Sequence, residues 1–217
     1  MTKILKIEIA SDVSCPWCII GYKSLSRALD QLEPEISAMI SWKPFELNPN
    51  MQEKGQLLSE HLHEKYGSKP DEVRQTEAMI TDRGKALGFQ FNFTDGRRIY
   101  NTFNAHRLLY WARQYNKQTE LKLALFKLYF TEGGNPSDAD QLLAVVKQVG
   151  LPVDEAEKVL NFEQYAKEVR EEEARILAMD INSVPTFMIN DKYKITGGQP
   201  PETFVEILKK IAAETES

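Results

Sequence analysis

The chain has 217 residues, of which 42% are hydrophobic and 27% charged, so a well-packed globular fold is expected. A formal net charge of −5 leaves no basic surplus to neutralise phosphates, which argues against nucleic-acid binding. No apolar run approaches the ~20 residues that a membrane-spanning helix needs, and the opening residues alternate in polarity, unlike a signal peptide. We therefore expect a cytoplasmic protein with neither a membrane nor a nucleic-acid partner.

The first fifty residues predict a β-α-β unit. Polar and apolar side chains alternate from the start to about Ser11, which indicates a strand. Helical spacing of apolar residues follows over 16–32 and ends before Pro34, and a second alternating stretch covers 36–45. Such a unit is expected to connect its two strands by a right-handed crossover.

From residue 57 to residue 179 the apolar spacing is predominantly helical. Ser137 with Asp140 resembles a capping box, Gly150 fits a C-terminal cap, and Asp154 with Glu157 opens a helix. The other predicted helices cover residues 73–87, 103–115, 121–130, 142–149 and 165–179. Several short helices are therefore expected here.

Extended segments return after Asp180. Two short strands over 186–189 and 193–196, joined by a turn at Asn190-Asp191, precede a closing helix over 201–212. The order β-α-β, helices, β-β-α places the chain in the α/β class. It predicts one domain made of residues 1–55 and 180–217, with an inserted helical domain over 56–179.

The chemistry of the sequence concentrates at Cys15-Pro16-Trp17-Cys18. A thiol at a helix start faces unpaired N–H groups, which are expected to lower its pKa below the free value of about 8.5. Cys15 is thus the predicted nucleophile, and Cys18, one turn later, is the predicted resolving thiol. Pro16 suits the first helical turn, and Trp17 offers an apolar platform beside the reactive sulfur.

The same two cysteines could instead form half of a zinc site, or be incidental thiols. Zinc would need two more ligands, and the histidines His61, His63 and His106 have a spacing that matches no common zinc motif. The sequence therefore favours a redox pair and predicts no metal site.

A second motif supports the redox interpretation. Val184-Pro185-Thr186-Phe187 opens a predicted strand. Together with the Cys-Pro-Trp-Cys motif it resembles the thioredoxin superfamily, in which this proline has a cis peptide bond and packs beside the cysteines. The resemblance implies that Pro185 is part of the catalytic site. It also implies that the backbone of Val184 pairs with an extended substrate.

The long helical block resembles the DsbA-like branch of that superfamily. Segments 11–21, 101–109 and 195–200 are similar to its FrnE-like subfamily, which is related to 2-hydroxychromene-2-carboxylate isomerase and kappa-class glutathione transferase. The resemblance implies a thioredoxin fold (βαβ…ββα) with a large all-helical insertion. Trp17 stands where periplasmic DsbA enzymes usually have histidine, which leaves the oxidising strength open.

The expected activity is thiol-disulfide oxidoreduction, as a disulfide reductase or isomerase, on protein or small-molecule disulfides. The expected cofactor is only the redox-active disulfide itself, with a cellular thiol reductant as recycling partner and glutathione as a candidate co-substrate. Pro16, Trp17 and Val184 are predicted to contact the substrate, and His106 is a further candidate. Asp12 is expected either to tune the cysteine pair or to cap the helix.

Two alternatives remain open. One is a glutathione-dependent transferase or isomerase, although such relatives usually have serine where this chain has Cys15. The other is a non-enzymatic binding or chaperone module that keeps the motif as a structural remnant. Persistence of function in a double Cys-to-Ser variant would be the evidence for the second alternative.

Overall fold

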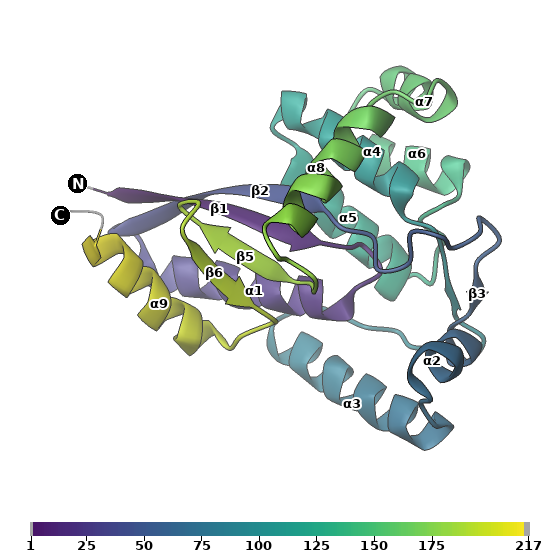
Figure 1. Ribbon diagram of the computed structural model, residues 1–217, viewed down its shortest axis with the longest axis horizontal. Coiled ribbons are helices and arrows are strands. Elements are labelled where there is room, and N and C mark those ends of the chain that lie inside the picture. The colour runs from purple at the N-terminus through teal and green to yellow at the C-terminus, as the bar shows by residue number, and fades with distance from the viewer. Residues whose placement is uncertain (1, 215–217) are drawn as a thin grey trace.

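A four-stranded mixed sheet forms the centre of the computed structural model, which describes residues 2–214 (Figure 1). Its spatial order is β2-β1-β5-β6. The strands are β1 (Lys3–Ser11), β2 (Ile36–Pro44), β5 (Thr186–Ile189) and β6 (Tyr193–Thr196). β1 runs parallel to β2 and antiparallel to β5, so that Ile9 is paired with Trp42 on one side and Phe187 on the other.

Helices cover both faces of this sheet. α1 (Pro16–Leu32) packs against α9 (Pro201–Glu214), and both bury side chains in one cluster with Ile7 and Ile9 of β1. α8 (Ala166–Ala178) packs against β2 and contributes Ile176 to a separate cluster on the opposite face, with Ala10 of β1 and Met188 of β5. The two faces follow from the period of two along the strands. The predicted α/β thioredoxin fold is confirmed.

The insertion between β2 and β5 is helical apart from one short ladder. Its other helices are α2 (Leu58–Tyr66), α3 (Pro70–Ala86), α4 (Phe103–Trp111), α5 (Gln118–Phe130), α6 (Ala139–Gln148) and α7 (Val153–Asn161). β3 (Gln56–Leu57) and β4 (Arg98–Ile99) form an antiparallel two-stranded pair, so the prediction of an all-helical insertion was wrong at this point. Figure 1 shows the inserted helices gathered toward the end of the sheet away from the two chain termini.

Most predicted helices occur within a few residues of the expected bounds, and the corrections concern their ends. Helix α6 is capped by Asp138, whose side chain accepts the N–H of Gln141 at 2.9 Å. The predicted capping box was therefore wrong by one residue, and the hydroxyl of Ser137 donates to the carbonyl of Glu53 instead. Gly150 has a φ of +74°, as expected of a residue that follows a helix end.

The insertion shares its core with the sheet. Phe126 and Phe130 of α5, and Ile80 of α3, belong to the same buried cluster as Ile7 and Phe187 of the sheet. The division into residues 1–55 with 180–217 and residues 56–179 stays a prediction, and residues 1 and 215–217 of that division lie outside the described residues. The shared cluster implies that the sheet and the inserted helices stabilise one another.

Candidate active site

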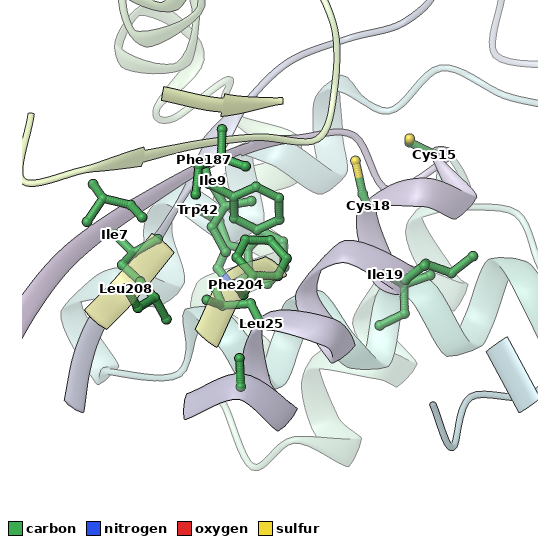
Figure 2. Close-up of a cluster of buried hydrophobic side chains, with 14 of the residues drawn as sticks. Ile7, Ile9, Cys15, Cys18, Ile19, Leu25, Trp42, Phe187, Phe204 and Leu208 are labelled. Carbon is green, nitrogen blue, oxygen red and sulfur yellow. The ribbon is translucent and has the colours of Figure 1, made fainter. Parts of the chain in front are cut away.

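Cys15 lies immediately before the first residue of α1. Its backbone is extended, with φ −96° and ψ 111°, and Pro16 occupies the first helical turn. The N–H of Cys18 donates to the carbonyl of Cys15 at 3.1 Å, so the two residues lie one turn apart. Both are free thiols, Cys15 4% exposed and Cys18 fully buried. Figure 2 shows both sulfur atoms at the start of this helix, at the edge of the buried cluster.

The loop before β5 meets this helix start. The Val184–Pro185 peptide bond is cis, as the sequence resemblance implied. The thiol of Cys15 donates to the carbonyl of Val184 at 3.7 Å. Gly21 permits this approach, because a Cβ there would lie 3.0 Å from the ring of Phe187 and 3.2 Å from that of Pro185. The structure thus brings residues from the two predicted motifs together.

The two thiols differ in acidity, and the expected direction for Cys15 was wrong. Interaction with Cys18, followed by burial, raises the pKa of Cys15 well above its usual value. Burial also opposes ionisation of Cys18, but contacts with Cys15 and Ser11 and the charge of Lys122 outweigh it and lower the pKa of Cys18. Because the two sulfurs interact, the first proton is lost from the pair at a lower pH than from a free thiol, and the second proton is lost only at a higher pH.

Asp12 precedes the Cys-Pro-Trp-Cys motif by three residues, and its side chain is buried, with an exposed fraction of 1%. Its carboxylate accepts the N–H of Ser14 at 3.2 Å and that of Leu47 at 2.8 Å, and lies 3.6 Å from Nε2 of His106. Burial opposes its ionisation, yet His106, the N–H of Leu47 and the charge of Lys122 hold the pKa of Asp12 below its usual range. Asp12 therefore does not cap α1, which was one of its two expected roles. The other expected role was to tune the cysteine pair, and the charge of Asp12 raises the pKa of Cys15.

His106 is 2% exposed and stands behind Asp12 rather than at an open surface. A cavity of about 400 Å³ opens beside Cys15, and His106 is not one of its lining residues. The candidate substrate contact of His106 thus has no support from its position. The structure places it instead as a neighbour of the buried carboxylate.

The cavity beside Cys15 lies between the start of α1 and the helices α2 and α3. The predicted contact residues Pro16, Trp17 and Val184 line it together with Cys15. Apolar walls are supplied by Leu58, Ile80, Phe93, Tyr129 and Phe130, and basic side chains by Lys65 and Arg97. A volume of this size suits a small molecule or a short peptide segment.

Lys122 of α5 is a buried residue near the thiols that sequence reasoning missed. It is fully buried, and its ammonium group donates to the carbonyl of Ser11 at 3.4 Å. Burial lowers the pKa of Lys122 to about 8. The only signal in the sequence is a single lysine within the apolar run Leu121–Leu125, where it interrupts the pattern.

Two absences are observed within the described part of the chain. Across residues 2–214, no group of three or more His, Cys, Asp or Glu side chains is arranged to hold a metal ion. None of the helices in that range combines the length and apolar character that crossing a membrane requires.

A dithiol at the start of α1 beside a cis-proline just before β5 is the arrangement of a thioredoxin-like protein, as the sequence resemblance implied. The chain belongs to the family of DSBA-like thioredoxin domains, whose model matches residues 6–209. It is 27% identical over 191 residues to the uncharacterized protein YwbO of Bacillus subtilis (strain 168), covering 85% of this chain and 86% of that protein.

Two solved structures extend the comparison. A probable DsbA oxidoreductase of Streptomyces coelicolor is 28% identical, with a TM-score of 0.89 over 95% of this chain and 89% of that one. A 2-hydroxychromene-2-carboxylate isomerase has a TM-score of 0.69 at 12% identity, over 97% of this chain and 98% of that one. The second likeness concerns the fold alone.

Proposed function

We propose that this protein is a thiol-disulfide oxidoreductase, acting as a disulfide reductase or isomerase, and that it belongs to the FrnE-like subfamily. The observation that carries the proposal is the pair of free thiols at the start of α1, with Cys15 next to Val184 at the edge of a cavity. Membership of the DSBA-like family supports the same chemistry. The fold alone would not support this chemistry, because proteins with unrelated activities can share one fold.

Cys15 is the attacking thiol in this proposal. It lines the cavity, whereas Cys18 does not and is fully buried. As Cys15 attacks one sulfur of a disulfide, its proton passes to Cys18, a new S–S bond forms, and the other substrate sulfur leaves as a thiolate. Cys18 then loses a proton and attacks Cys15, which releases the second substrate thiolate and leaves the pair oxidised.

The oxidised pair must be reduced again before another turnover. The proposed partner is a cellular thiol reductant, with glutathione as a candidate co-substrate and no cofactor beyond the redox-active disulfide. We place the reaction in the cytoplasm, where glutathione and thioredoxin systems keep most thiols reduced. Protein and small-molecule disulfides are both proposed substrates, approaching through the cavity that Pro16, Trp17 and Val184 line.

A glutathione-dependent transferase or isomerase is the second candidate. The observation that favours it is the cavity of about 400 Å³ beside Cys15, which suits a small bound thiol and its co-substrate. In that case Cys15 would orient or activate glutathione, and the protein itself would not cycle between dithiol and disulfide. The two candidates therefore differ in whether Cys18 is needed.

Trapping the covalent intermediate tests the proposed function. Cys18→Ser removes the resolving thiol, so Cys15 is expected to accumulate as a mixed disulfide with the substrate. Intact-protein mass spectrometry after incubation with oxidised glutathione would show the added mass, and peptide mapping would place it on Cys15. The double Cys15→Ser/Cys18→Ser variant is the control without adduct. Absence of any adduct in Cys18→Ser would contradict covalent exchange at Cys15.

A further inference from the structure

Lys122 of α5 is a fully buried cation. Its Nζ lies 3.4 Å from the carbonyl of Ser11 and over the rings of Trp42 and Phe126, at 5.4 and 5.1 Å from their centroids. Within residues 2–214, no carboxylate oxygen lies within 4.0 Å of this nitrogen. A neutral carbonyl and two rings compensate only part of the cost of burying a full charge.

Cys18 lies in the same buried surroundings as Lys122. Both side chains are fully buried, and the rings of Trp42 and Phe126 that face the ammonium group belong to the same buried cluster as Cys18. The charges of Cys18, Asp12 and Cys15 all favour the protonated form of Lys122. Ser11 links the two groups. Its carbonyl accepts from Lys122 at 3.4 Å, and its side chain helps to lower the pKa of Cys18. The fold therefore brings a cation from the inserted helices to the resolving sulfur.

We propose that Lys122 is a positioning residue for thiol-disulfide exchange, whose buried ammonium group stabilises the thiolate of Cys18. The inference rests on the proposed function, for which it supplies the charge needed at the resolving step. In the mixed disulfide, Cys18 releases its proton to solvent and the resulting thiolate forms a bond to Sγ of Cys15. The bond between Cys15 and the substrate sulfur breaks, and its electron pair leaves on the substrate thiolate.

Several other titratable groups face Lys122 and belong to the same electrostatic environment. They are Asp12 and Cys15 before α1, Cys18 of α1, Lys43 of β2, His106 of α4 and Arg113 after α4. A change of pH therefore alters several charges at once. A variant that changes Lys122 alone is needed to isolate its contribution.

The pKa of Cys18 is the direct readout, measured by thiolate ultraviolet absorbance in a Cys15→Ser background, where Cys18 is the only thiol. Lys122→Met keeps the length of the side chain but removes the charge, so the pKa of Cys18 is expected to rise by about one unit, a tenfold loss of thiolate near neutral pH. Lys122→Arg keeps a charge and is expected to hold the pKa low. Lys127→Met, on the exposed side of the same helix, is the matched control.

The reciprocal measurement does not depend on Lys122 being replaceable. Side-chain NMR of Lys122 should show a lower pKa in Cys15→Ser/Cys18→Ser than in Cys15→Ser, because interaction free energies are mutual. An unchanged pKa of Cys18 in folded Lys122→Met, or an unchanged pKa of Lys122 on loss of Cys18, would overturn the proposal. Neither pKa measurement requires turnover, so both test the role of Lys122 independently of the proposed function. The proposed function would be refuted by a different result, a wild-type protein that does not exchange disulfides.

Discussion

Replacing Cys15 with serine is expected to lower disulfide-exchange turnover by at least about 10³-fold, the order of loss when a covalent nucleophile is removed. A serine hydroxyl does not attack disulfides at neutral pH, and Cys18 is fully buried and does not line the cavity. Cys18 therefore cannot take over the first step. Steady-state reduction of a small disulfide with glutathione as the reductant measures the effect.

The control for Cys15→Ser is the stability of the variant. Serine is close in size to cysteine and can donate to the carbonyl of Val184, so the free energy of unfolding should change by less than about 1 kcal/mol. A folded variant whose turnover stays within about tenfold of wild type would contradict nucleophilic attack by Cys15. That result would favour the glutathione-dependent transferase or isomerase, whose relatives usually have serine at this position.

Phe187→Ala is expected to reduce the free energy of unfolding by about 3–5 kcal/mol, the range for emptying a phenylalanine site in a core. Phe187 is fully buried in β5 and packs edge-on against Phe204 of α9, with ring centroids 5.0 Å apart. The ring of Phe187 also lies against Gly21 of α1, where an added Cβ would be only 3.0 Å from it. The cavity left by the substitution would loosen the strand that positions Pro185. Urea unfolding of the reduced protein measures the loss.

An exposed phenylalanine provides the comparison for Phe187. Phe162 is 72% exposed, so Phe162→Ala should change the free energy of unfolding by less than about 0.5 kcal/mol. A loss below about 1 kcal/mol in Phe187→Ala would show that the interface between α1, β5 and α9 is not the core described above.

Local patterns predicted the sheet and its flanking helices well because the signals there are strong. Alternation along β1, the proline at the start of α1 and the turn at Asn190-Asp191 each restrict the backbone over a few residues. The pair formed by β3 and β4 could not be predicted this way, since each strand has only two residues. Their pairing depends on contacts between segments about forty residues apart.

The candidate site was predictable where it consists of contiguous motifs. Cys15 and Cys18 stand in one motif, and the resemblance supplied Pro185. Lys122 was missed because lysines are rarely buried, and nothing in its helix indicates that it faces the thiols. The direction of the Cys15 pKa was missed for a related reason: the expectation considered the helix start alone, whereas contact with the sulfur of Cys18, followed by burial, raises the pKa of Cys15 in the structure.

A glutathione redox titration of the wild-type protein tests the central claim most directly. Thiol alkylation and mass spectrometry would follow the fractions of dithiol and disulfide as the ratio of reduced to oxidised glutathione changes. We predict one reversible two-electron transition that joins Cys15 to Cys18, and its midpoint would separate a reductase from an oxidase. Failure to form a reversible disulfide, with glutathione bound but not oxidised, would contradict the proposed dithiol-disulfide cycle.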